Sequence, residues 1–126
     1  MNAFRSAVEG RDLEAMGAAL HPDVLFRSPV VFKPYEGREA VMFLLGNILQ
    51  VFEEFEYTDE LQGDGTHALI FRARVGERWV DGLDHLTLDD DGLVTQLVVM
   101  VRPLSGLTAV AEAMGERLGQ SRPGVS

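Results

Sequence analysis

The spacing of apolar side chains divides the chain into a helical first half and a strand-rich second half. Up to residue 52, apolar residues recur every three or four positions, which is the spacing of one face of a helix. We predict helices over residues 2–9, 13–21 and 38–52, the last being the most amphipathic, and a short strand over 24–29. From residue 56 onward the period changes to two, which indicates strands.

Four strands account for most of the second half. We place them at residues 56–62, 66–75, 78–88 and 93–102. The segments between them are short and rich in glycine and aspartate, as hairpin turns are: 63–65, 76–77 and 89–92. We therefore predict an antiparallel meander. A C-terminal helix follows from Leu104 to Leu118, and residues 119–126 have the composition of a frayed tail.

Asp84 is the unusual residue of the predicted strand 78–88. Successive strand residues point to opposite faces, so Asp84 shares its face with Val80, Leu86 and Leu88. An unpaired carboxylate is very costly to bury, so it must be paired, neutralised or solvated. The sequence thus predicts a pocket around Asp84.

The turn lengths predict which residues lie opposite Asp84. A two-residue turn at 76–77 pairs Leu69 with Asp84, and a four-residue turn at 89–92 pairs Asp84 with Leu97. A three-residue turn at 63–65 pairs Tyr57 with Phe71 and Leu61 with His67. With these pairings, one face of the sheet should cover the helices. That face collects Tyr57, Leu61, His67, Leu69, Phe71, Ala73, Val80, Asp84, Leu86, Leu97, Val99 and Val101.

The opposite face of the predicted sheet is mixed in character. It collects Arg72, Arg74, Trp79, Asp81, Leu83, His85, Val98, Met100 and Arg102. Tryptophan, methionine and arginine are typical of protein–protein interfaces, so this face, with Trp79, His85 and Met100, is a predicted homodimer surface. A solvated sheet face is the alternative.

Composition and charge narrow the class of protein. A chain of 126 residues without cysteine fits one domain, which we place at residues 1–118, and suits the cytoplasm. The net charge of -9 would repel phosphate backbones, so we expect no nucleic-acid partner. No apolar run is long enough to span a membrane, and no membrane partner is expected. The three separated histidines lack metal-ligand spacing, so no metal site is expected either.

Six short motifs stand out along the chain: Arg11-Asp12-Leu13-Glu14-Ala15-Met16, His21-Pro22-Asp23-Val24, Ser28-Pro29-Val30, Tyr35-Glu36-Gly37-Arg38-Glu39-Ala40, Leu83-Asp84-His85 and Asp91-Gly92-Leu93-Val94. In this order they resemble the motifs of the nuclear transport factor 2-like superfamily. The superfamily includes ketosteroid isomerases, SnoaL-like (polyketide-cyclase-like) proteins and limonene epoxide hydrolases. The resemblance implies an α+β, cone-shaped fold, in which a curved antiparallel sheet packs on three helices from the N-terminal half, with a further C-terminal helix.

The resemblance to ketosteroid isomerases also implies a role for Asp84. In those enzymes an aspartate base moves the proton, while a tyrosine and a protonated aspartate donate hydrogen bonds to the oxyanion. Asp84 falls at the position of the protonated aspartate, whereas Ser28 occupies the base position and Phe4 the tyrosine position. Serine is a poor base and phenylalanine cannot donate, so we do not expect steroid isomerisation itself. Asp81 and Arg72 could mimic part of an epoxide hydrolase site, but they are expected on the face away from the pocket.

We expect the pocket to bind or transform an apolar compound that bears a carbonyl group. Asp84 is its polar centre and, in a catalytic version, His67 or Tyr57 assists without any metal or organic cofactor. The ligand-binding residues predicted to surround Asp84 are Ser28, Tyr57, Phe4, Phe26, Phe71, Val99 and Val101. Three alternatives stay open. Asp84 could be a structural acid bonded to His67, Tyr57 or a backbone group. The protein could also be a non-catalytic dimeric binding or interaction module, or an epoxide hydrolase-like enzyme.

Overall fold

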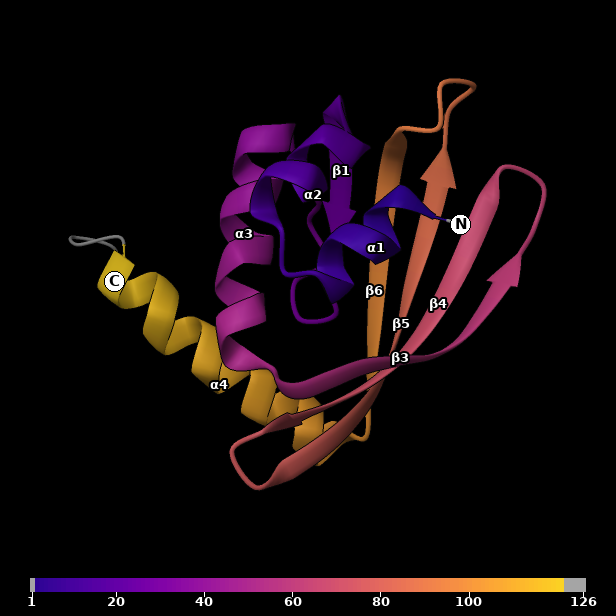
Figure 1. Ribbon diagram of the computed structural model, residues 1–126. Helices are drawn as coiled ribbons and strands as arrows, with labels where there is room; N and C mark the ends of the chain where they lie inside the picture. Colours follow the sequence, from indigo (N-terminus) through magenta and orange to yellow (C-terminus); the bar gives the residue numbers. More distant parts are fainter. Residues whose placement is uncertain (1, 122–126) are drawn as a thin grey trace.

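A computed structural model describes residues 2–121, and it has four helices and six strands in that range (Figure 1). In chain order they are α1 (Ala3–Glu9), α2 (Leu13–Ala19), β1 (Leu20–Arg27), β2 (Tyr35–Glu36), α3 (Arg38–Val51), β3 (Glu53–Gln62), β4 (Thr66–Val75), β5 (Arg78–Leu88), β6 (Val94–Arg102) and α4 (Leu104–Ser121). The first two helices begin at side-chain caps, since the carboxamide of Asn2 and the carboxylate of Asp12 accept backbone N–H groups of the first turns.

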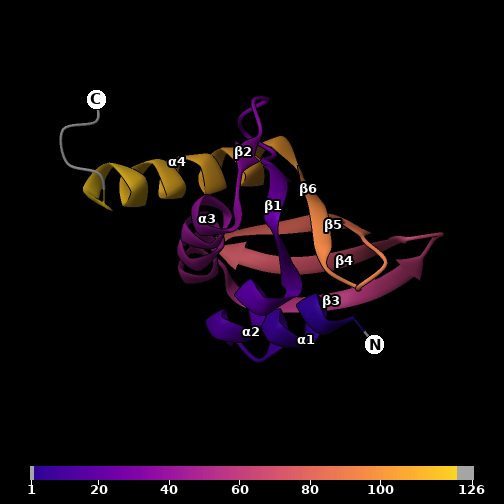
Figure 2. The ribbon, with the colours of Figure 1, turned by 90° about the horizontal axis from the view of Figure 1, so that it is seen from above.

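The strands form one curved sheet in the order β2-β1-β6-β5-β4-β3. The meander from β3 to β6 is antiparallel, as predicted, while β1 runs parallel to β6, so the whole sheet is mixed. Figures 1 and 2 show α3 facing the sheet, with α1 and α2 at one end and α4 at the other. The predicted α+β class and curved sheet are confirmed.

The boundary between α2 and β1 differs from the prediction. The helix ends at Ala19 rather than at residue 21, and β1 already begins at Leu20, with Pro22 inside the strand. Its pairing with β6 is interrupted between Leu20 and Leu25. Because proline lacks an N–H group, it is tolerated in such an interrupted stretch, where no regular ladder needs that donor.

The pairing on the two sides of Asp84 was predicted correctly on one side only. Leu69 lies opposite Asp84 in β4, as the two-residue turn required. In β6, however, the partner is Val99 and not Leu97. Leu88 pairs with Val94, so the turn has five residues instead of four and displaces the register by one residue, and a bulge between Thr87 and Leu88 displaces it by one more. Val99 lies two positions beyond Leu97, and a displacement of two residues leaves every side chain on its predicted face.

The pairing of β3 corrects a second expectation. Tyr57 pairs with Phe71 as predicted, but the register then shifts beyond Tyr57, and Leu61 lies opposite Ala68 instead of His67. This displacement by one residue turns Leu61 to the outer face, where 54% of it is exposed. Leu61 is therefore not part of the inner face.

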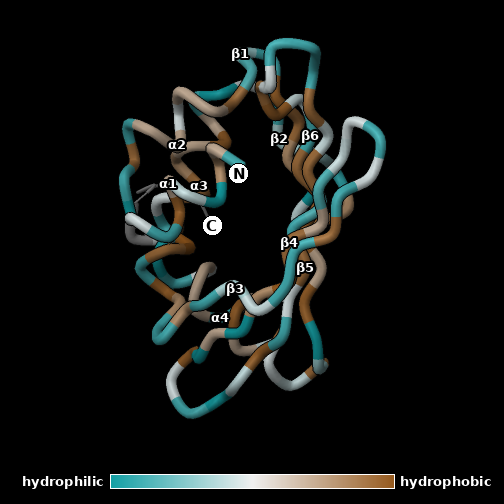
Figure 3. Tube along the Cα trace, turned by 45° about the vertical axis from the view of Figure 1, so that its right-hand side comes forward, coloured by the Kyte–Doolittle hydropathy of each residue, from teal (hydrophilic) through white to brown (hydrophobic). Residues whose placement is uncertain are grey.

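The hydrophobic core lies between the inner face of the sheet and the helices. Figure 3 shows hydrophobic positions along the central strands and largely hydrophilic ones at the turns. Phe71, Leu69, Leu86 and Leu97 are almost fully buried. Gly82 makes one tight contact possible, because a Cβ atom there would lie 2.0 Å from the ring of Phe71.

The C-terminal helix is longer than predicted. It continues past Leu118 to Ser121, while the rest of the predicted tail, residues 122–126, lies outside the described residues. No helix in the described range is long and apolar enough to cross a membrane.

Candidate functional site

A cavity of about 240 Å³ lies between the sheet and the helices, and Asp84 is part of its wall. All the side chains predicted to bind a ligand line it: Phe4, Phe26, Ser28, Tyr57, Phe71, Val99 and Val101. Four of the lining residues have a side-chain oxygen atom: Ser28, Tyr35, Tyr57 and Asp84. The side chains of all the others contain neither oxygen nor nitrogen. The cavity is thus apolar with few polar points, as small-molecule sites usually are.

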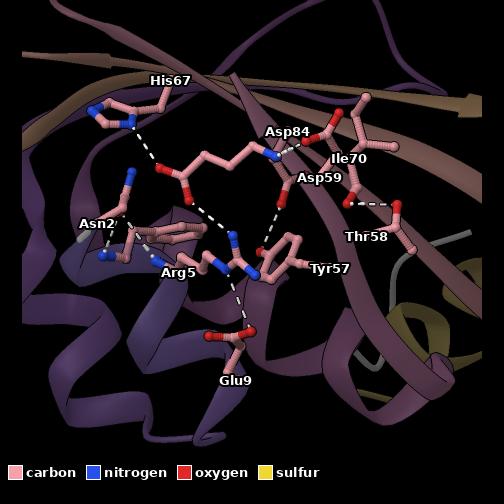
Figure 4. Close-up of polar contacts among 11 residues, drawn as sticks. Asn2, Arg5, Glu9, Tyr57, Thr58, Asp59, His67, Ile70 and Asp84 are labelled. Carbon is pink, nitrogen blue, oxygen red and sulfur yellow. Dashed lines mark hydrogen bonds and ion pairs between the residues drawn. The ribbon is translucent and has the colours of Figure 1, made fainter. Parts of the chain in front are cut away.

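Asp84 is the only ionisable carboxyl group among the lining residues, and only 7% of it is exposed. Its Oδ2 accepts a hydrogen bond of 3.0 Å from the hydroxyl of Tyr57 (Figure 4). Burial disfavours the charged form and raises the pKa of Asp84 to about 7, although the bond from Tyr57 acts in the opposite direction. Near neutral pH this carboxyl group can therefore be present in both its protonated and its ionised form.

Tyr57 reaches Asp84 from β3 and stays protonated. Burial, and after it the negative charge of Asp84, raise the pKa of the Tyr57 hydroxyl. A phenol carries a single proton, and here the proton is directed at Asp84. Tyr57 can therefore offer a bound molecule a lone pair but no second donor.

Aromatic rings form the wall of the cavity beside this pair. The ring of Phe55 stacks on Phe71 with centroids 4.9 Å apart, and it meets Tyr57 edge-on at the same centroid distance. Phe52 lies close to both Phe71 and Phe55, with centroid distances of 5.5 Å and 5.9 Å. These contacts hold the rings in place, so the wall is rigid and apolar.

His67 lies outside the cavity lining. Its Nδ1 is 3.1 Å from Oε2 of Glu60, and the other oxygen of Glu60 accepts a 2.9 Å bond from Arg5 (Figure 4). The bond from Arg5 is the main reason why the pKa of Glu60 is lowered. Arg5 in turn lies 5.4 Å from the ring centroid of Tyr57. Among the described residues His67 makes no hydrogen bond to Asp84, so the predicted assistance of His67 stays a prediction.

Ser28 and Phe4 do line the cavity, with different surroundings. The Ser28 hydroxyl oxygen accepts the backbone N–H of Val30 at 3.0 Å and that of Val31 at 3.4 Å, so it shapes the loop after β1. Phe4 is almost fully buried and contributes only apolar surface. Neither side chain supplies a base or a donor of the kind that ketosteroid isomerases use at these positions.

The outer face of the sheet holds the other predicted residues. Trp79 and Met100 are 48% and 56% exposed, His85 is half-buried, and the guanidinium of Arg72 lies over the Trp79 ring. Asp81 forms ion pairs on this face and is not part of the cavity lining. The Asp81–Arg72 pair therefore lies away from the cavity, as the turn lengths predicted.

The C-terminal helix contributes cavity residues that were not predicted. Val110, Met114 and Leu118 from α4 line the cavity. The apolar stripe of this helix was visible in the sequence, but a stripe does not say which part of the sheet it covers. Within residues 2–121 no cluster of three or more His, Cys, Asp or Glu side chains could hold a metal ion.

Comparisons with solved structures support the fold. A protein from Pseudomonas aeruginosa described as a steroid delta-isomerase has 45% sequence identity and a TM-score of 0.89, covering 94% of this chain and 88% of that one. A Silicibacter pomeroyi protein described as having a cystatin-like fold has 34% identity and a TM-score of 0.87, covering 92% and 82%. A SnoaL-like protein from Burkholderia thailandensis shares the fold at 17% identity and a TM-score of 0.68, covering 80% and 90%.

Comparison with protein families and with curated proteins adds to these structural similarities. No curated protein matches the chain. A family described as the SnoaL-like domain matches residues 1–97, which include β1, α3 and the strand that carries Asp84. The chain belongs to the SnoaL-like domain family, within the nuclear transport factor 2-like superfamily.

Proposed function

We propose that the cavity binds a compact apolar molecule with a carbonyl or hydroxyl group, and that Asp84 contacts this group. The observation that carries the proposal is a buried carboxyl group with a pKa of about 7 in the wall of an otherwise apolar cavity. Buried acids are rare unless they are partnered, and the partner of Asp84 within the described residues is one tyrosine hydroxyl.

The protonated form of Asp84 suits a ligand that accepts a hydrogen bond. Tyr57 donates to Oδ2, and no bond to Oδ1 is formed by the described residues. A proton on Oδ1 can then be donated to a carbonyl oxygen of the ligand, among apolar side chains that strengthen such a hydrogen bond.

A catalytic version of the proposal makes Asp84 the group that moves a proton. A pKa near 7 suits general acid–base catalysis at neutral pH, since both protonation states are populated. The similar structure described as a steroid delta-isomerase supports a steroid-like or other cyclic ketone as the substrate class. Because Ser28 supplies no carboxylate, Asp84 itself would take the proton and return it.

A thermal-shift screen of cyclic ketones tests the proposal. Ligands that raise the melting temperature of the wild type should raise that of Asp84→Ala much less, because the contact to the ketone oxygen is lost. Asp81→Ala is the matched control, since Asp81 lies on the same strand outside the cavity lining. Equal shifts in the wild type and in Asp84→Ala would exclude Asp84 as a ligand contact.

We also propose that two copies of the protein form a homodimer through the outer face of the sheet. This proposal does not depend on whether the cavity is catalytic. The exposed side chains of Trp79 and Met100, beside the half-buried His85, are the observation that favours it. Trp79→Glu replaces an exposed aromatic side chain of this face with a charge, so the variant should be a monomer by light scattering where the wild type is a dimer. A monomeric wild type, or an unchanged dimer in Trp79→Glu, contradicts this assignment.

A further inference from the structure

Tyr57 and Asp84 form the polar end of the cavity, and both offer acceptor oxygen atoms. None of the lining residues is lysine, arginine or histidine. Arg5 of α1, which lies over the ring of Tyr57 but outside the lining, is bonded to Glu60 and Glu9. When Asp84 is ionised, its charge therefore has no counter-cation inside the cavity, and this leaves a position for one.

The geometry of Tyr57 and Asp84 favours a ligand group with several N–H donors. The phenolic oxygen lies 3.0 Å from Oδ2 of Asp84 and directs its proton there. Around this bond, the lone pair of Tyr57 and the carboxylate oxygens of Asp84 are all acceptors. An ammonium group carries a positive charge and up to three donors, so it can meet both residues at once.

The neighbouring rings add a second contribution to cation binding. Phe55 lies within 4.9 Å of both Phe71 and Tyr57, centroid to centroid, and all three line the cavity. The faces of such rings attract a cation, and aromatic walls are used to bind alkylammonium ligands. The net charge of -9 also favours the approach of a cation over that of an anion.

The same features exclude acids as ligands. A carboxylate or phosphate group entering the cavity would meet a carboxyl group and apolar walls, with no basic side chain in the lining. Such a group would lose its hydration without a compensating partner. The cavity therefore discriminates by charge as well as by polarity.

We propose that the cavity also binds apolar compounds that carry one ammonium group, with the cation held between ionised Asp84, the Tyr57 oxygen and the aromatic wall. The inference rests on the proposed function, because both assign Asp84 as the polar contact of the ligand. It adds a second ligand class at the same site, selected by the protonation state of Asp84. Neutral acceptors bind the protonated form, and amines bind the ionised form.

Three probes with one rigid carbon cage test the charge selection by calorimetry at pH 6 and pH 8. 1-Aminoadamantane, which stays cationic over this range, should bind roughly tenfold more tightly at pH 8, since its affinity follows the ionised fraction of Asp84. 2-Adamantanone should show the opposite trend by a similar factor. 1-Adamantanecarboxylate should not bind measurably at either pH.

Asp84→Asn separates this inference from the proposed function. The asparagine amide can still donate to the ketone but carries no charge, so the variant should keep ketone binding, lose its pH dependence and lose the amine. Asp81→Asn should behave as the wild type does with all three probes. Retained ketone binding also shows that the Asn variant is folded.

Each other result contradicts a defined part of the account. Amine binding that is equal at both pH values, or equal in Asp84→Asn, overturns the ammonium site. Binding of the ketone without the amine overturns the ammonium site and leaves the proposed function standing. If neither probe binds, both proposals are wrong.

Discussion

Asp81 and Asp84 lie close together on β5 but in opposite surroundings. The side chain of Asp81 is 47% exposed on the outer face, where Oδ2 lies 2.9 Å from Arg102 and Oδ1 lies 3.8 Å from Arg72. Asp84 faces the cavity, and its described partner is the hydroxyl of Tyr57. One acid has two cationic partners in water, and the other has a neutral partner among apolar side chains.

The comparison shows that the face of the strand decides the chemistry of each acid. Alternation along β5 sends residue 81 outward and residue 84 inward, so two identical side chains receive different dielectric surroundings. Exposed ion pairs of the kind Asp81 makes contribute little to stability. The Asp84 carboxyl group is desolvated, and its pKa is therefore raised to about 7. A group with such a pKa can take part in ligand binding or proton transfer at neutral pH.

The largest expected difference between the two acids is in the pH dependence of stability. Burial raises the pKa of Asp84 from 3.8 to about 7, so the folded protein holds this proton where the unfolded chain releases it. The contribution of Asp84 to stability is complete below pH 4 and is lost as the pH rises through about 7. The free energy of unfolding of Asp84→Asn, relative to wild type, should rise by about 4 kcal/mol over this window, at about 1.36 kcal/mol per pH unit.

Urea denaturation of both proteins at several pH values measures this difference. Taking the difference between wild type and variant cancels the titration of the other carboxyl groups. A difference that stays constant from pH 4 to pH 8 would mean that Asp84 is hydrated in the folded protein.

A smaller effect on stability is expected at Gly82. This residue lies between Asp81 and Asp84 in the sequence, and it is on the inner face of the sheet. A Cβ atom at this position would overlap the Phe71 ring, which Phe52 and Phe55 hold in place. Gly82→Ala should therefore destabilise the protein by about 1–3 kcal/mol. The shifted ring should also weaken ketone binding.

Gly46→Ala is the matched control for that substitution. Gly46 lies inside α3, and a Cβ atom there would meet no neighbouring side chain within 4 Å. Alanine should therefore stabilise the helix by about 0.5–1 kcal/mol. Urea denaturation compares the two variants. Equal effects of both substitutions would contradict the tight contact at Gly82.

Tyr57→Phe tests the neutral partner of Asp84. Loss of the buried hydrogen bond should cost about 1 kcal/mol. Because that bond lowers the pKa of Asp84, its loss should raise the pKa further above 7. NMR titration of the Asp84 carboxyl carbon measures the change, and a lowered midpoint would show that Tyr57 does not donate to the ionised group.

The smallest effect is expected at the outer acid. Asp81→Asn breaks exposed ion pairs with Arg102 and Arg72 and should change stability by less than about 1 kcal/mol. Added salt should reduce the change further, since exposed charges are screened. A loss of several kcal/mol in denaturation experiments would remove the contrast between the two acids.

Local sequence rules predicted the half of the site that short turns determine. The two-residue turn at 76–77 placed Leu69 beside Asp84, and the alternation along the strand assigned the inner face correctly. The bulges after Tyr57 and Thr87 were not predictable, because an inserted residue has no clear pattern of its own. The first bulge moved Leu61 out of the inner face. The second bulge added to a turn that is one residue longer than predicted, and the total displacement of two residues left the face of β6 unchanged.

The contacts between distant segments were the part that the sequence left open. The parallel pairing of β1 with β6 and the placement of α4 over the cavity depend on packing between the two ends of the chain. The bond between Tyr57 and Asp84 was one of several open pairings for the acid, beside His67. His67 instead contacts Glu60. The shift of the β3 register by one residue brings Glu60 next to His67.

The central claim is that Asp84 is a desolvated carboxyl group in the wall of a ligand cavity. NMR titration of its side-chain carboxyl carbon in the wild-type protein tests this claim most directly. The account predicts a midpoint near pH 7 that changes when 2-adamantanone fills the cavity. A midpoint near the ordinary aspartate value, unchanged by the ketone, would contradict it.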